Sequence, residues 1–339
     1  MLKKTHRALF AITITILTLI ACGTDKGHFV IEGHLLNLNQ GQFIVYSPDG
    51  AIEGIDTITI NGGRFTYEPE CQKEGMVLLI MPNGTEIPVF VEPGASISMD
   101  GNAQNLKEIA IKGLDENKQM DEFRKSIAGM AATRSNALPV KQVSDIIGKY
   151  PKSRVGYYLV KHYLMEATQP DYASAQRLLA ILKKEQPDNL PLNVLAGVAR
   201  DLQQTSKGSR LPVLELTDIN GKRIPDSKLR KGYTVITAFG SWDFESIAQI
   251  RRLRDANRGK TDKLNIIALS LDASKHECRH SFTDTTDVTL LCDGMMTEGK
   301  TARRLVITQT SQALIIKDGN IISRTLSGNQ LIDYMRSLP

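Results

Sequence analysis

Alternating apolar and polar positions characterise residues 28–113. Residues 56–60 and 64–67 alternate in this way on either side of Asn61-Gly62-Gly63, which is the pattern of a β-hairpin with a tight turn. Further strands are predicted at 28–33, 42–46, 77–81, 87–91 and 95–99. Short strands at this spacing predict a β-sandwich or barrel-like domain whose role is packing or binding.

The periodicity becomes helical over residues 114–207. Apolar residues recur three and four positions apart within 157–164 and 173–182. Prolines lie near the ends of these segments, as expected at helix boundaries, at positions 151, 170, 187 and 191. No repeat of about 34 residues is visible, so we predict a helical spacer rather than an array of helix pairs.

Residues 208–339 alternate between strand and helix patterns. Strands are predicted at 211–216, 233–239, 264–270, 288–292, 313–316 and 321–323. Helices are predicted at 243–257, ending near Gly259, and at 274–282 and 329–338. This order predicts an α/β domain with a sheet of mixed polarity. The whole chain is therefore expected to be multidomain: all-β, helical spacer, then α/β.

The start of the chain has the composition of a secretory signal. Three basic residues precede an apolar run over 9–21, which is too short and too rich in threonine for a membrane-spanning helix. The run ends Leu19-Ile20-Ala21-Cys22, which resembles a bacterial lipobox. We predict a signal peptide over 1–21 and a tether over 22–27 lipidated at Cys22. The alternative is an uncleaved N-terminal anchor helix.

The predicted cleavage changes how composition and charge are interpreted. The 339 residues are 41% hydrophobic and 23% charged, which is globular composition and argues against disorder, collagen-like repeats or many membrane spans. Cleavage would remove Lys3, Lys4 and Arg7 and lower the formal net charge from +5 to +2, so no nucleic-acid partner is expected. Gly23 follows Cys22, and the resemblance to bacterial lipoproteins therefore implies sorting to the outer membrane, facing the periplasm or the surface.

Several short motifs relate the last domain to a known fold. They are Leu211-Pro212 with Leu216, Asp218 and Gly221, then Leu229-Arg230-Lys231-Gly232, then Ala238-Phe239-Gly240-Ser241-Trp242. With these motifs, residues 208–339 resemble the thioredoxin-like fold, in the branch of membrane-anchored thiol–disulfide oxidoreductases and alkyl hydroperoxide reductase/thiol-specific antioxidant-like proteins. The whole chain resembles bacterial envelope lipoproteins that place a β-domain of unknown function before such a domain.

The resemblance implies a redox motif Trp-Cys-x-x-Cys, which here reads Trp242-Asp243-Phe244-Glu245-Ser246. Disulfide exchange needs an activated thiolate and a second thiol that resolves the mixed disulfide, and neither Asp243 nor Ser246 can supply one. The proline that the family holds in the cis form falls at Thr310, where we expect a trans peptide bond. The acidic residue that the family buries beneath the motif falls near Thr237. The sequence therefore predicts that disulfide exchange at this motif has been lost.

Asp243 has two interpretations. As an N-cap it would stabilise the start of the following helix by about 1 kcal/mol. Alternatively, Asp243, Glu245 and Trp242 line a groove that binds a peptide or a small ligand.

Two cysteines remain in this domain away from the motif. Cys278 lies within a predicted helix and Cys292 in an apolar strand, where thiols are usually inert. They are interpreted as buried thiols, with a disulfide or a redox-active pair as alternatives. His276 and His280 share a helix face, but Cys278 points elsewhere, and two ligands without a third do not define a metal site. No metal or cofactor is expected.

These patterns favour a lipid-anchored envelope protein with a redox-inactive thioredoxin-like domain. Its expected role is binding or scaffolding, with an envelope protein or peptide as partner. The alternative is a thiol–disulfide oxidoreductase or antioxidant protein that uses Cys278 and Cys292.

Overall fold

The computed structural model describes residues 27–132, 139–258, 264–324 and 326–338, so Cys22, the predicted signal peptide 1–21 and Gly259 lie outside the described residues. The chain divides into two compact units between Tyr163 and Leu164. This boundary falls inside the segment 114–207 that the sequence pattern treats as one spacer. Within the described ranges, no helix is long and apolar enough to cross a membrane.

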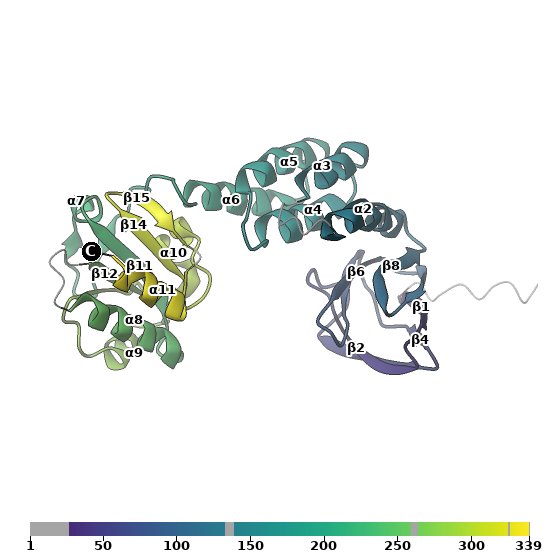
Figure 1. Ribbon diagram of the computed structural model, residues 1–339, viewed down its shortest axis with the longest axis horizontal. Helices are drawn as coiled ribbons and strands as arrows, with labels where there is room; N and C mark the ends of the chain where they lie inside the picture. Colours follow the sequence, from purple (N-terminus) through teal and green to yellow (C-terminus); the bar gives the residue numbers. More distant parts are fainter. Residues whose placement is uncertain (1–26, 133–138, 259–263, 325, 339) are drawn as a thin grey trace, which may run out of the picture. The chain divides into compact units, whose positions relative to one another are not determined.

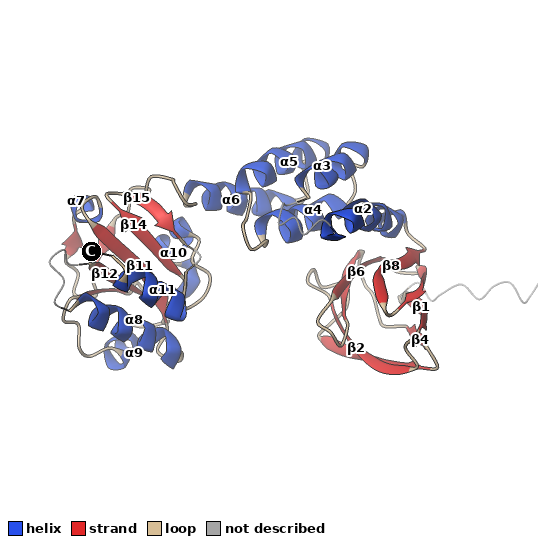
Figure 2. Ribbon diagram, viewed as in Figure 1, coloured by secondary structure: helices blue, strands red, loops and turns tan. Residues whose placement is uncertain are grey.

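An eight-stranded sheet forms most of the first unit (Figure 2). Its strands are β1 (Val30–Leu36), β2 (Gln40–Tyr46), β3 (Ile55–Asn61), β4 (Arg64–Tyr67), β5 (Gly75–Ile80), β6 (Glu86–Val91), β7 (Ser96–Asn102) and β8 (Asn105–Lys112). The strand order is β6-β5-β2-β3-β4-β1-β7-β8, and only the β1–β7 pair is parallel among these described strands. The predicted hairpin is present as β3 and β4, whereas β8 was not predicted.

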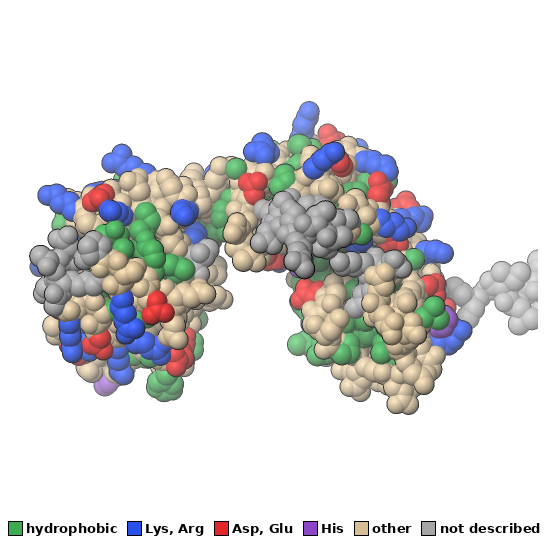
Figure 3. All heavy atoms as spheres, in the orientation of Figure 1, with side chains coloured by type: hydrophobic (Ala, Val, Ile, Leu, Met, Phe, Trp, Pro, Cys, Tyr) green, Lys and Arg blue, Asp and Glu red, His purple; other side chains and the backbone are tan. Residues whose placement is uncertain are grey.

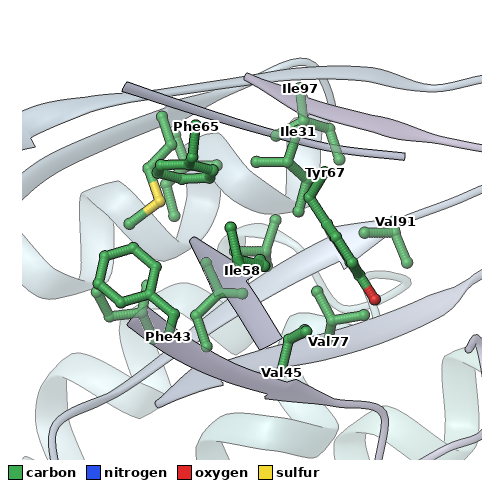
Figure 4. Packing of buried hydrophobic residues seen from close by; sticks show 14 of the residues in the cluster. Ile31, Phe43, Val45, Ile58, Phe65, Tyr67, Val77, Val91 and Ile97 are labelled. Atoms are coloured by element: carbon green, nitrogen blue, oxygen red, sulfur yellow. The ribbon is translucent and has the colours of Figure 1, made fainter. Parts of the chain in front are cut away.

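Every strand of this sheet contributes side chains to one core (Figure 4). Phe43 and Phe65 meet edge to face with ring centroids 5.6 Å apart. Gly33 lies opposite Phe65 in the β1–β4 register, and a Cβ atom on Gly33 would stand 1.9 Å from the Phe65 ring. The missing side chain is therefore what admits the ring. All eight strands belong to one sheet around one core, and the two edge strands of this sheet are β6 and β8.

Helix α2 (Asp115–Ala132) satisfies backbone groups on both edge strands of this sheet. Asn117 accepts a hydrogen bond from Phe90 N at 2.8 Å and donates one to Phe90 O at 2.9 Å on β6. Asp121 accepts from Ile111 N at 3.0 Å on β8. Exposed strand edges promote unwanted pairing with other chains, and α2 covers both edges here. The first unit continues with α3 (Val140–Lys149) and α4 (Val155–Val160), and the π-helical turn Lys161–Met165 that follows contains the boundary between the units.

The second unit begins with a pair of packed helices, α5 (Tyr172–Glu185) and α6 (Leu190–Gln204). Their first turns are capped by Asp171, which accepts from Ser174 N, and Asn189, which accepts from Leu192 N. A two-stranded ribbon follows, β9 (Leu216–Thr217) with β10 (Arg223–Ile224), and then the short helix α7 (Asp226–Leu229). The prediction of a strand over 211–216 was wrong, because only its last residue belongs to β9.

A five-stranded sheet in the order β13-β12-β11-β14-β15 forms the centre of the second unit (Figure 1). Its strands are β11 (Tyr233–Phe239), β12 (Asn265–Ser270), β13 (Val288–Leu291), β14 (Ala313–Lys317) and β15 (Asn320–Ser323). Strands β11, β12 and β13 are parallel, while β14 and β15 form the predicted antiparallel hairpin. This mixed sheet agrees with the expected thioredoxin-like α/β fold.

Helices cover both faces of this sheet. One face packs against α8 (Phe244–Asn257), α9 (Lys275–Ser281) and α11 (Gly328–Arg336), and the other packs against α10 (Lys300–Leu305) and the residues Leu211, Leu214, Leu216, Ile224 and Leu229. A short 3-10 turn, Met296–Glu298, precedes α10. Basic and acidic side chains are interspersed on the visible surface of both units (Figure 3).

Candidate functional site

The degenerate motif lies where β11 ends and α8 begins, and Asp243 is the N-cap of α8, as one of its two interpretations predicts. One carboxylate oxygen accepts from Glu245 N at 3.1 Å and from Ser246 N at 3.3 Å. A hydrogen bond from the Thr310 hydroxyl lowers the pKa of Asp243, burial opposes this effect, and the two backbone N–H groups add to it. The carboxylate is therefore an ionised structural acceptor at the positive end of the helix.

Ser246 also forms hydrogen bonds with neighbouring backbone groups. Its side chain is fully buried, and its hydroxyl donates to Asp243 O at 2.7 Å and accepts from Gly240 N at 3.3 Å. The two motif positions thus hold each other and the strand end in place. Neither offers a thiol, so the redox step of a Cys-x-x-Cys motif has no reacting atom here.

The residues beside these two positions are exposed and apolar. Trp242 is 57% exposed and Phe244 is 82% exposed. A Cβ atom at Gly240 would stand 2.7 Å from carbons of the Trp242 ring, so the ring lies directly against the Gly240 backbone. The absence of a side chain at Gly240 therefore sets the orientation of the tryptophan.

Thr310 lies close enough to Asp243 to donate the hydrogen bond described above. No peptide bond in the described residues is cis, so the bond before Thr310 is trans, as expected. The loop is held on the sheet because Ser311 N donates to Ala238 O and Ala238 N donates to Gln312 O, both at 2.9 Å. The Gln312 side chain also accepts from Thr308 N at 2.8 Å.

A buried amide, which the sequence interpretation missed, lies beneath the motif. Gln249 donates to the Thr237 hydroxyl at 2.8 Å and to Ser311 O at 3.1 Å, and it accepts from Gly328 N at 2.6 Å. One uncharged side chain thus ties together α8, β11, the Thr310 loop and α11. The available signal was a polar residue between Ile247 and Ile250 on the apolar face of α8.

Cys278 and Cys292 are brought together in the core between α9 and the sheet. Both are buried and neither forms a disulfide. Their thiols hydrogen-bond to each other, which raises the pKa of Cys278 and lowers the pKa of Cys292. Burial raises the pKa of both thiols. The two cysteines therefore form one site in the core of the second unit.

A buried polar chain connects the thiols with the motif. Both thiols contact the hydroxyl of Ser270. That hydroxyl donates to the buried Asp272 carboxylate at 2.6 Å and accepts from Asp272 N at 3.0 Å. The other oxygen of Asp272 accepts from Ser241 N at 2.8 Å, immediately before Trp242.

The two histidines of α9 do not extend this site into a metal centre. His276 and His280 meet edge to face with ring centroids 4.4 Å apart. Among the described residues, no group of three or more His, Cys, Asp or Glu side chains is arranged to hold a metal ion.

Comparisons with known proteins give a family match for part of the chain. Residues 29–120, which span the eight-stranded sheet and the start of α2, match the family "Domain of unknown function (DUF4369)". No curated protein matches the chain.

Solved structures similar to part of the chain are thioredoxin-like proteins. One is a thiol-disulfide oxidoreductase from Bacteroides fragilis, with 20% identity over 39% of this chain and 100% of that chain, at a TM-score of 0.35. Another is a thioredoxin-like protein from Bacteroides caccae, with 13% identity over 58% of this chain and 77% of that chain, at a TM-score of 0.44. A third is the thioredoxin domain of a thiol-disulfide oxidoreductase from Bacteroides vulgatus, with 14% identity over 38% and 94%, at a TM-score of 0.33.

Proposed function

We propose that this chain is a lipid-anchored envelope protein whose second unit binds an extended polypeptide without catalysing disulfide exchange. One observation carries the proposal. The two positions of the redox motif hold Asp243, which caps α8, and Ser246, whose hydroxyl donates to Asp243 O, while the neighbouring Trp242 and Phe244 are exposed. The motif region therefore has an exposed apolar surface but no thiol that could exchange a disulfide.

The proposed binding surface is the edge where the parallel strands β11, β12 and β13 end. Open α/β sheets bind ligands at this edge. Met295 and Met296, 58% and 47% exposed, follow β13 at the same edge. The backbone of Gly294 packs against Ala273 just beyond β12, which keeps this loop at the edge. Exposed aromatic and methionine side chains suit the apolar side chains of an unfolded or extended polypeptide.

A disulfide-reductase assay tests the absence of exchange. The wild-type protein should not accelerate insulin reduction by dithiothreitol, and the double variant Asp243→Cys/Ser246→Cys should gain this activity because it restores both thiols. The single variant Asp243→Cys is the matched control and should lack turnover, since no resolving thiol is present. Robust turnover by the wild-type protein would refute the proposal.

The rival function is an oxidoreductase that uses Cys278 and Cys292, and the contact between their thiols is the observation in its favour. It predicts wild-type turnover that Cys278→Ser abolishes. It also predicts that a thiol-reactive dye labels at least one of the two cysteines in the native protein. Absence of both effects would leave the binding role as the better account.

The proposed anchor at Cys22 has its own test. Cells producing the wild-type protein should incorporate labelled palmitate into it and retain it in the membrane fraction. Cys22→Ala should abolish both, whereas Cys71→Ala, which changes a buried cysteine of the first unit, should change neither. Membrane retention of an unlabelled Cys22→Ala protein would instead support an uncleaved N-terminal helix.

A further inference from the structure

Helix α6 has an apolar face that is exposed in the described part of the chain. Leu190, Val194 and Val198 recur every four residues, so they lie on one face of the helix. Their exposed fractions are 74%, 67% and 37%. The buried residues of α6 lie on another face and hold the helix within its unit. We call the three exposed residues the α6 stripe, and they form apolar surface that folding of the unit does not use.

Gly197 lies beside this stripe, three residues after Val194. Glycine inside a helix is less favourable than alanine. Apart from the nearby backbone of α6 itself, no atom of the described chain lies within 4 Å of the place where a Cβ atom of Gly197 would stand. Packing within the described chain therefore does not require a glycine here. A missing side chain does allow a second helix to approach closely, because the distance between two helix axes depends on the side chains at the contact.

Opposite charges lie at the two ends of the α6 stripe. The exposed Asp188 precedes Val194 by the same number of residues as Arg200 follows it. The Arg200 side chain is 64% exposed, and its contact with Asp201 at 3.4 Å is a surface ion pair of the kind that contributes little to stability. Arg200 is therefore available to another acid. An antiparallel pair of α6 helices centred on Val194 places Asp188 of each copy level with Arg200 of the other.

We propose that the α6 stripe pairs antiparallel with the same stripe of a second copy of this chain, with Val194 on the two-fold axis. A two-fold interface requires a surface that complements itself, and here Leu190 faces Val198 of the second copy while the charged ends match. One helix face offers less than the roughly 800 Å² per partner of a standard interface, so the pair is weak in dilute solution. The inference does not rest on the proposed polypeptide binding, because the stripe is separate from the edge that carries Trp242.

Disulfide cross-linking in intact cells that produce the full-length protein tests this pairing. With copper phenanthroline as oxidant, Val194→Cys should form a covalent dimer, because a residue on the two-fold axis meets its own copy. Val213→Cys is the matched control, since Val213 is 73% exposed in the same unit but lies outside the α6 stripe. Val194→Cys should cross-link roughly tenfold faster than this control, because pairing raises the effective concentration of the thiols. Equal rates for the two variants would overturn the proposal.

The positions at the ends of the stripe test the antiparallel direction. In the proposed pair the two copies of residue 190 lie about 12 Å apart along the helix axis, at 1.5 Å per residue, which is beyond the reach of a disulfide. Leu190→Cys alone should therefore not cross-link. Cells that produce Leu190→Cys together with Val198→Cys should form the mixed dimer. Cross-linking of Leu190→Cys alone as fast as the mixed pair would mean a parallel or unspecific contact and would contradict the proposal.

Gly197→Ala separates association from folding. It should raise the urea midpoint of the protein, because alanine favours the helix, yet slow cross-linking of Val194→Cys roughly tenfold, because the added methyl group keeps the two helices apart. Gly148→Ala is the matched control, since Gly148 in α3 also has open space at its Cβ position. It should raise the midpoint and leave cross-linking unchanged. Cross-linking that Gly197→Ala does not slow would rule out the close approach on which the pairing depends. These readouts need no polypeptide ligand, so their failure is distinct from failure of the proposed function.

Discussion

The second unit contains two places that can be compared, the loop around Trp242 and the Cys278–Cys292 pair. A thioredoxin-like redox site combines an exposed surface with thiols, whereas here the two features are separate. The motif loop has exposed apolar side chains at Trp242 and Phe244 but no thiol. The Cys278–Cys292 pair has two thiols but is buried. The hydrogen bonds of Asp272 with Ser270 and with Ser241 N lie between the buried thiols and the exposed aromatic side chains. The difference teaches that exposed apolar side chains and thiols occupy separate places in this unit, so each can be tested without changing the other.

The largest expected effect is a loss of stability on removal of Asp272, which lies between the thiol pair and the loop that carries Trp242. Asp272→Ala leaves Ser241 N and the Ser270 hydroxyl without their shared acceptor in the core, which should lower the free energy of unfolding by about 3 kcal/mol. Urea denaturation measures this loss. Asp293→Ala is the matched control, because Asp293 accepts from Met295 N at an exposed position. Asp293→Ala should lower the free energy of unfolding by less than about 1 kcal/mol. An equal loss in the two variants would show that the buried hydrogen bonds of Asp272 stabilise the fold no more than an exposed one does.

The next effect concerns the exposed surface alone. Trp242→Ala and Phe244→Ala should each weaken binding of an unfolded polypeptide by roughly tenfold or more, as expected for central aromatic contacts. Reduced, carboxymethylated lactalbumin is a suitable probe, with affinity measured by calorimetry. Stability should change by less than about 1 kcal/mol, because both side chains are largely exposed.

The control for that surface is Val213→Ala, an exposed apolar residue that precedes β9 rather than following the parallel strands. It should leave affinity unchanged. If Val213→Ala weakens binding as much as Trp242→Ala does, the binding surface is not the edge proposed here.

The smallest effect tests whether Asp243 is an ionised N-cap of α8. Asp243→Ala should destabilise the protein by about 1 kcal/mol at pH 7, because α8 loses its N-cap. The folded protein lowers the pKa of Asp243, so its contribution is present above the usual carboxyl pKa of about 4 and is lost as pH falls through the lower folded value.

The difference in unfolding free energy between the wild-type protein and Asp243→Ala should therefore narrow below about pH 4. Glu245→Ala, at an exposed first-turn position of the same helix, should cost less than about 0.5 kcal/mol. A difference for Asp243→Ala that stays constant down to low pH would contradict the assignment of an ionised cap.

Much of the second unit could be predicted because its local signals agree with the fold. The β-branched run over 233–239 forms β11, and the Lys317–Asn320 segment turns between β14 and β15. Strand β8 could not be predicted in this way. Its sequence, Asn105 to Lys112, contains the helix formers Leu, Lys, Glu and Ala, and its pairing with β7 overrides that preference. Conversely, 211–215 is apolar enough for a strand but forms none, and Leu211 and Leu214 pack against the second face of the sheet.

The sequence alone determined which chemistry the motif loop lacks, because residue identity at positions 243 and 246 settles whether a thiol is present. It also placed Asp243 at a helix start, since capping depends on local order along the chain. Only the tertiary structure brought Cys278 to Cys292 and Gln249 to Ser311 and Gly328. Both faces of the sheet are covered, so alternation along β13 could not say which helix its side chains would meet. That choice depends on how α8, α9 and α11 pack on one face, a contact between segments distant in sequence.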